Sequence, residues 1–144
     1  MTNEEMSAKK YLDRYRDAVN QVLNLEGQAM QLKRLAGGVS PDLSKEKAPS
    51  NHISDPTGEI GAKLADISEE IASAVSEAID ILAEVRHTIN DVEDAVSRRL
   101  LHLRFIERRT WEAIAAEMNI SFRHVFRVRE RALREAYYVI ECHS

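Results

Sequence analysis

The sequence predicts an all-α protein in which a long antiparallel helical hairpin, a coiled coil, is followed by a trihelical helix-turn-helix domain. Apolar residues recur every three or four positions along most of the 144 residues, which is the spacing of one helix face. Only five Gly, three Pro and 6% aromatic residues occur, and all three prolines lie in one segment. We therefore expect the hairpin, with its flexible linker at 37–58, over residues 1–90, and the helix-turn-helix domain over residues 91–144.

Residues 4–36 predict the first long helix. Tyr11, Tyr15, Ala18 and Val22 begin an apolar stripe that continues to Ala36. The pair Gly37 and Gly38 ends the pattern, because glycine readily adopts the left-handed conformation that closes a helix.

Residues 37–58 predict a mobile linker, since this segment holds every proline and almost no residue that could be buried. A tolerated flexible loop is the simplest interpretation, and ordering by a partner is the alternative.

Residues 59–89 predict the second long helix, whose apolar positions run from Leu64 to Ile89 at spacings of three and four. Its outer face is acidic. A two-stranded hairpin buries little apolar surface, so we expect self-association into a four-helix bundle, as a homodimer.

Residues 91–135 predict three short helices around a common core. The apolar stripes of the three helices are Leu100, Leu101, Leu103 and Ile106; Trp111, Ile114, Ala115 and Met118; and Phe122, Val125, Val128 and Ala132. Asn90 or Asp91 is expected to cap the first helix, and the last helix is expected to continue through Ile140, with the final three residues frayed.

The turn between the second and third short helices is the most informative point. Asn119 stands where the chain must reverse, and asparagine tolerates the left-handed conformation. Ser121 follows as a natural N-cap, and Ala115 is small enough for close helix packing. This pattern favours the compact geometry of a helix-turn-helix.

Placing Val125 and Val128 in the core turns a basic face outward on the third helix. That face holds Arg123, His124, Arg127, Arg131 and Arg134. Residues 97–136 contain ten Arg and five Glu, whereas residues 1–96 contain ten basic and eighteen acidic residues. This segregation is an electrostatic footprint of nucleic-acid binding that the net charge of −4 conceals.

The segments Thr110–Ala115, Ser121–Val125 and Arg127–Leu133 resemble region 4 of sigma-70-type factors, and resemble still more a family of small phage and prophage proteins of unknown function that carry such a region at their C-terminus. The resemblance covers residues 91–135. It implies a last helix placed in the major groove and contact with RNA polymerase. Arg108 and Arg109 stand where these proteins often have glycine, and no promoter-melting region 2 is present.

The spacing of acidic, His and Cys residues in the sequence predicts neither catalysis nor metal binding. Glu77, Asp80 and Glu84 share a helix face without a histidine at ligand spacing, so a solvated face is the simplest interpretation. The five His are scattered and there is one Cys, so we expect no metal site, no cofactor and no enzyme activity. No signal peptide or membrane-spanning run is recognisable, and the lone Cys142 suits a reducing compartment, so we expect a cytoplasmic protein without a membrane partner.

The sequence therefore predicts a DNA-binding transcriptional regulator of phage origin that reads duplex DNA with the helix at 121–135. The predicted DNA-binding residues are Ser121, Phe122, Arg123, His124, Arg127, Arg131, Arg134, Arg108 and Arg109. Trp111 is expected to be a packing anchor rather than a base-stacking platform. One alternative is a protein-interaction module that docks on RNA polymerase or a sigma partner without reading DNA. Another is a helix-turn-helix subunit of a recombination or DNA-packaging machine.

Overall fold

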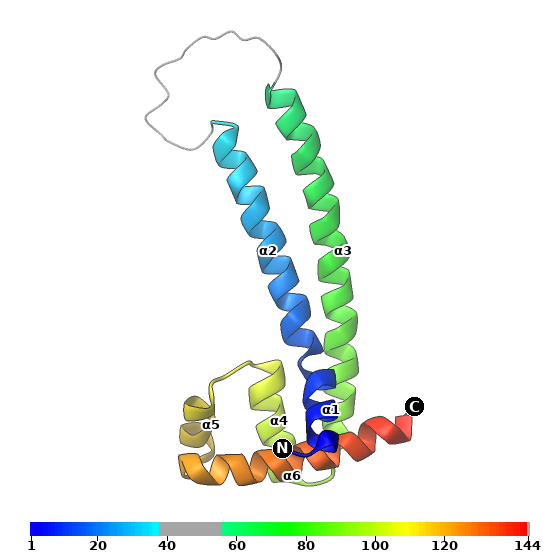
Figure 1. Ribbon diagram of the computed structural model, residues 1–144, viewed down its shortest axis with the longest axis vertical. Helices are drawn as coiled ribbons and strands as arrows, with labels where there is room; N and C mark the ends of the chain where they lie inside the picture. Colours follow the sequence, from blue (N-terminus) through cyan, green and yellow to red (C-terminus); the bar gives the residue numbers. More distant parts are fainter. Residues whose placement is uncertain (38–55, 144) are drawn as a thin grey trace. The chain divides into compact units, whose positions relative to one another are not determined.

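The computed structural model describes residues 1–37 and 56–143, and this part of the chain is helical without any strand. The helices are α1 (Asn3–Leu12), α2 (Arg14–Leu35), α3 (Pro56–Asn90), α4 (Ala95–Leu101), the π-helix η2 (His102–Ile106), α5 (Trp111–Met118) and α6 (Phe122–His143), shown in Figure 1. The all-α fold class is confirmed. Most of the predicted linker, residues 38–55, lies outside the described residues.

The chain forms two compact units, one of residues 1–18 with 77–144 and one of residues 19–76. The first unit thus contains the start of the chain and the end of α3 as well as the C-terminal helices. The predicted domain boundary between residues 90 and 91 stays a prediction.

The core of the first unit is a single apolar cluster. It includes most residues of the three apolar stripes predicted for the C-terminal helices, and it also includes residues of α1 and of the end of α3. Its buried members include Ala8, Leu12, Val85, Ile89, Leu100, Leu101, Leu103, Phe105, Ile114, Ala115, Val125, Val128, Ala132, Leu133 and Ala136. Phe122, expected in the stripe, is instead 47% exposed. The reason is its position as the first residue of α6, where its side chain lies at the end of the packed helix face.

The N-terminal helix is shorter than predicted. A capping box joins Thr2 and Glu5 at the start of α1. The continuous helix expected over residues 4–36 is interrupted at Asp13, where α1 ends and α2 begins. The Asp13 carboxylate accepts a hydrogen bond from Lys9 at 2.7 Å and lies 3.6 Å from Arg16. Uniform apolar spacing carries no signal for this break.

The cap of α4 also differs from the prediction. Asp94 is the N-cap, since its Oδ2 accepts a hydrogen bond from the Ser97 N–H at 2.8 Å. Asn90 is the last residue of α3, and Asp91 precedes the connecting loop. Asp91 and Asp94 both lie before the helix, and Asp is a favoured N-cap residue, so the sequence alone does not indicate which of them is the cap.

The two helices α5 and α6 are joined as predicted. Thr110 caps α5 through the Ala113 N–H at 3.1 Å. Asn119 adopts the left-handed conformation with φ 58°, and the Ser121 Oγ accepts a hydrogen bond from the His124 N–H at 3.0 Å. Helix α6 extends through His143, so the fraying expected for Cys142 and His143 is not observed; Ser144 lies outside the described residues.

The second unit consists of residues 19–35 of α2 and 56–76 of α3, which run in opposite directions (Figure 1). Helix α2 ends before Gly37, whose φ of 84° matches the predicted glycine stop. Leu25 is buried, whereas Leu23, Met30 and Leu35 are 52%, 54% and 71% exposed. Among the described helices, none is sufficiently long and apolar to cross a membrane.

Candidate nucleic-acid interface

The basic face of α6 begins with three exposed side chains. Val125 and Val128 are buried against the core, as predicted, and Arg123, His124 and Arg127 face solvent. Within residues 1–37 and 56–143, these three side chains form no ion pair or hydrogen bond. They can therefore meet an external ligand without breaking an ion pair or hydrogen bond among the described residues.

An aromatic cluster lies beside the turn between α5 and α6. The exposed Phe122 ring meets Phe126 edge-on at 5.0 Å, and Phe126 lies 6.0 Å from Trp111. Guanidinium groups lie over the Trp111 ring, from Arg104 at 4.4 Å and from Arg129 at 5.7 Å. Trp111 packs against the core, which confirms its predicted role as a packing anchor.

The later arginines of α6 are engaged in ion pairs. Arg131 lies 2.6 Å from Asp94, the N-cap of α4. Arg134 donates a hydrogen bond to Glu5 of α1 at 2.9 Å, and the Glu5 side chain is only 2% exposed. Both arginines lie on the solvent side of α6, as predicted, but each carries an internal counter-charge that the sequence did not identify.

These pairs change the acidity of their partners. Burial alone would raise the pKa of Glu5, but hydrogen bonds from Arg134 and from the Thr2 backbone outweigh burial and lower that pKa. The pKa of Asp94 is lowered mainly by its hydrogen bond from the Ser97 backbone, with a contribution from the charge of Arg131. Both carboxylates are therefore stabilised in the charged form.

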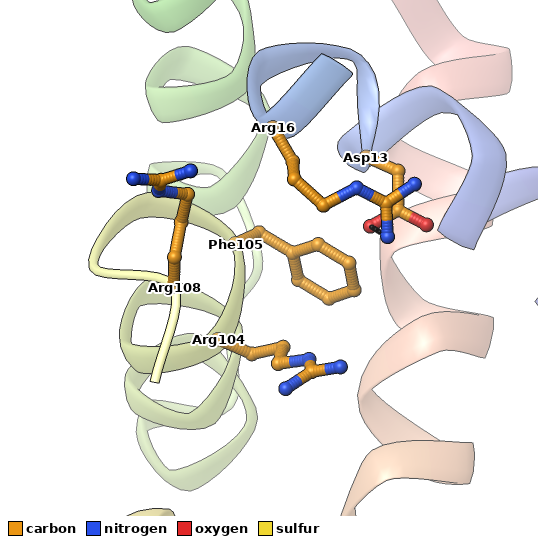
Figure 2. A pocket seen from close by; sticks show the side chains of 5 residues that line it. All are labelled: Asp13, Arg16, Arg104, Phe105 and Arg108. Carbon is orange, nitrogen blue, oxygen red and sulfur yellow. Dashed lines mark ion pairs between the residues drawn. The ribbon is translucent and has the colours of Figure 1, made fainter. Parts of the chain in front are cut away.

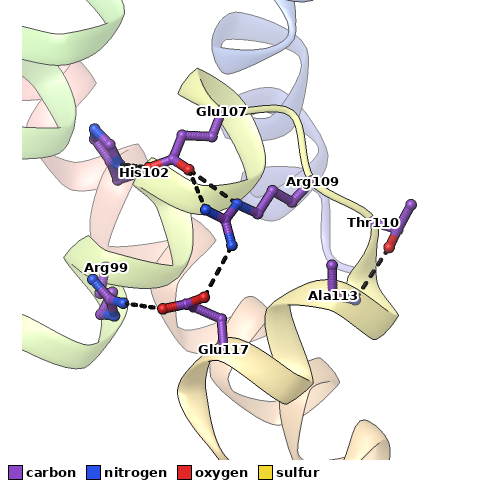
Figure 3. A network of polar contacts seen from close by, with 7 residues as sticks. All are labelled: Arg99, His102, Glu107, Arg109, Thr110, Ala113 and Glu117. Atoms are coloured by element: carbon purple, nitrogen blue, oxygen red, sulfur yellow. Dashed lines mark hydrogen bonds and ion pairs between the residues drawn. The ribbon is translucent and has the colours of Figure 1, made fainter.

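Arg109 belongs to a polar network between the end of η2 and α5 (Figure 3). Arg109 donates hydrogen bonds to Glu107 at 2.9 Å and to Glu117 at 3.0 Å. Both hydrogen bonds raise the pKa of Arg109, and the one to Glu117 has the larger effect. Glu117 also accepts a hydrogen bond from Arg99 at 3.0 Å, so one carboxylate joins two arginines. Arg109 is thus a partner of two acidic side chains rather than an isolated basic group.

Arg108 lines a small pocket of about 100 Å³ together with Asp13, Arg16, Arg104 and Phe105 (Figure 2). Arg16 pairs with Asp13, and Arg104 donates a hydrogen bond to the Arg109 carbonyl at 2.8 Å. Burial lowers the pKa of Arg104, and the nearby positive charges of Arg16 and Arg129 add to this effect.

The Arg108 guanidinium points away from the Phe105 ring (Figure 2). Among the described residues, no hydrogen bond or ion pair involves the Arg108 side chain. Its backbone is left-handed, with φ 58°, at the turn where the resemblance to sigma region 4 predicts glycine. Arg108 therefore joins Arg123 and Arg127 as an arginine whose charge is not compensated within the described chain.

Sequence reasoning missed the acidic partners Glu5 and Asp94. Glu5 lies 129 residues before Arg134, and Asp94 lies 37 residues before Arg131. The only sequence signal at Glu5 is its place in a capping box, which predicts a local role and not a contact with α6.

Comparison with known proteins identifies a family for this chain. No curated protein and no solved structure matches the chain. A family model described as "Protein of unknown function (DUF1492)" matches residues 40–136, which include α3, α4, η2, α5 and most of α6. The chain belongs to this DUF1492 family.

Proposed function

We propose that this protein is a sequence-specific DNA-binding regulator of transcription that places the N-terminal half of α6 in the major groove. The observation that carries the proposal is the division of α6 into a buried face, with Val125 and Val128, and an exposed face, with Arg123, His124 and Arg127. A tightly joined helix pair with a solvent-facing second helix is the arrangement that reads DNA in helix-turn-helix proteins.

The exposed side chains have the chemistry that base readout needs. An arginine forms two parallel hydrogen bonds with the O6 and N7 acceptors of guanine, and an apolar group contacts the methyl group of thymine. In this proposal Arg123 and Arg127 provide the first kind of contact, and the exposed Phe122 provides the second. His124 donates a hydrogen bond to a base or a phosphate.

Phosphate contacts supply the sequence-independent part of the affinity. Arg108 suits this role, because its guanidinium is exposed and has no partner among the described residues. Ser121, which caps α6, lies beside backbone N–H groups that attract anions at a helix start. Arg109, Arg131 and Arg134 make a smaller contribution, since each must exchange an internal carboxylate for a phosphate.

The resemblance to region 4 of sigma factors supports a promoter target and a phage or prophage origin, with RNA polymerase as a second partner. The family assignment is compatible with this proposal and adds no activity of its own. Docking on polymerase without DNA contact remains the alternative, and the experiment below separates the two.

Homodimer formation through the second unit is the remaining part of the proposal. It is supported by the exposed Leu23, Met30 and Leu35 on α2 and by Val75 on α3, which is 38% exposed. Covering such side chains in a helical bundle removes apolar surface from water. A dimer also presents two copies of α6 to a palindromic site.

A mobility-shift assay tests the proposal. Purified full-length protein is titrated into random duplex DNA at low and moderate salt, and bound duplexes are selected from a random pool and sequenced. Salt-sensitive binding with an enriched sequence supports the proposal. Absence of a shift at low salt, together with capture by purified RNA polymerase, establishes the docking alternative.

A further inference from the structure

Two histidines and an aspartate meet where α3 and α6 end. His87 lies in the last turn of α3, Asp91 follows α3, and His143 is the last residue of α6. The Asp91 Oδ2 lies 3.0 Å from the His143 Nε2 and 3.7 Å from the His87 Nε2. The candidate ligand atoms of all three residues lie within 4.8 Å of one another.

The positions of these residues are set by the core of the first unit. Val85 and Ile89 on either side of His87 are buried, and so is Ala136 of α6. His87 and Asp91 are four residues apart, so their side chains share one side of the helix end. The His87 and His143 rings stack with centroids 5.3 Å apart and planes 27° apart. The cluster thus combines a local helical pair with a residue from a second helix.

We propose that His87, Asp91 and His143 form a binding site for a late first-row divalent metal ion, with Zn²⁺ as the reference ion. Two imidazole nitrogens and one carboxylate oxygen are donors that this class of ion prefers. The nitrogen and oxygen ligands of a tetrahedral zinc ion lie about 3.3 Å apart, because each metal–ligand bond is about 2.0–2.1 Å long. The two distances to Asp91, 3.0 and 3.7 Å, bracket this separation.

The surroundings leave a fourth position open to solvent. The side chains of His87, Asp91 and His143 are 72%, 43% and 42% exposed, so an ion can enter without rearrangement of the core. A hollow of about 410 Å³ adjoins the site, and Glu135, Tyr138 and Cys142 are among its lining residues. Three protein ligands with a water molecule in the fourth position are the arrangement of an open zinc site.

Metal binding links the C-terminal ends of α3 and α6. Because the ion binds the folded arrangement of all three ligands, it stabilises the folded state by an amount that grows with the logarithm of its concentration relative to its dissociation constant. The sequence predicted no such site, since the five His are scattered and the ligand set depends on the meeting of two helices distant in the chain.

This inference is tested by treating the full chain with a chelator and then titrating it with Zn²⁺ in an isothermal titration calorimeter. The wild type should bind one ion per chain, and His87→Ala and His143→Ala should each weaken binding by more than the roughly 10- to 100-fold that loss of an outer-shell partner costs. Thermal unfolding should shift upward with Zn²⁺ in the wild type and not in these two variants.

Two variants serve as controls. His102→Ala removes another exposed histidine, one that pairs with Glu107 at 3.2 Å, and should leave Zn²⁺ binding unchanged. Cys142→Ser should also retain binding, and the Co²⁺ complex of the wild type should show no thiolate charge-transfer band. The inference is overturned if the wild type does not bind Zn²⁺, if both His87→Ala and His143→Ala bind as the wild type does, or if Cys142→Ser loses the ion.

Discussion

Arg134 of α6 donates a hydrogen bond at 2.9 Å to Glu5 of α1, and the Glu5 carboxylate is almost wholly buried. This pair joins two helices whose residues lie 129 positions apart. Arg134 therefore stabilises the fold, whereas Arg127 on the same helix has no such partner among the described residues. Substitution should therefore destabilise the protein at Arg134 and leave its stability nearly unchanged at Arg127.

Replacing Arg134 by Ala should lower the free energy of unfolding by roughly 1–3 kcal/mol, because it leaves a buried acceptor without its charged donor. Arg127→Ala, at an exposed position, should change it by less than about 0.5 kcal/mol. Urea unfolding followed by circular dichroism measures both. Equal stability of the two variants would show that the Glu5 pair contributes nothing.

The stability of the protein should fall in acid partly through Glu5. Its pKa in the folded state lies below the usual value of 4.5, so the unfolded state binds the proton more tightly. The contribution of the ionised carboxylate is fully present above pH 4.5 and is lost as the pH falls through the lower folded-state pKa.

Comparing the wild type with Glu5→Gln across this acidic range measures that contribution. The difference in unfolding free energy between the two proteins should be largest near neutral pH and should shrink as the pH falls. A difference that is independent of pH would mean that Glu5 acts through packing and not through its charge.

Replacing Arg108 by Gly should raise stability, because a non-glycine residue in the left-handed conformation costs roughly 1–2 kcal/mol. Arg108→Ala is the matched control, since it removes the same charge and keeps the strained backbone. Thermal unfolding should separate the two variants, and both should bind DNA more weakly at low salt. If the glycine variant is no more stable than the alanine variant, the turn carries no strain.

Self-association should depend on the exposed apolar side chains of α2. The double variant Leu23→Gln, Met30→Gln should be monomeric at concentrations at which the wild type is a dimer, since it replaces apolar surface that the proposed bundle covers. Light scattering coupled to size-exclusion chromatography reports the mass directly. A wild type that is monomeric at micromolar concentration would exclude the dimer.

Local signals in the sequence are sufficient to predict the turn that precedes α6. The left-handed Asn119 and the capping Ser121 act within three or four residues, so the residue types alone indicate the geometry. The burial of Val125 and Val128 follows from helical spacing in the same way.

Contacts between distant segments could not be predicted on this basis. Helical spacing indicates which side of α6 faces outward, but it does not indicate that Glu5 and Asp94 approach that side. The meeting of His87 with His143 is another contact of this kind. The break at Asp13 was missed because the apolar stripe continues across it.

In the proposed function, the exposed arginines at the start of α6 contact DNA. The most direct test measures, as a function of salt, the affinity of the wild type and of the double variant Arg123→Ala, Arg127→Ala for the selected duplex. Arg34→Ala on α2 is the control for removing one positive charge elsewhere on the protein. Removing an arginine that reads a base should weaken the binding free energy by roughly 1–3 kcal/mol, and removing one that contacts a phosphate should reduce the slope of the salt dependence by about one. We expect the double variant to bind at least about tenfold more weakly, with both variants equally well folded. If the double variant binds as tightly as the wild type at every salt concentration, Arg123 and Arg127 do not contact DNA.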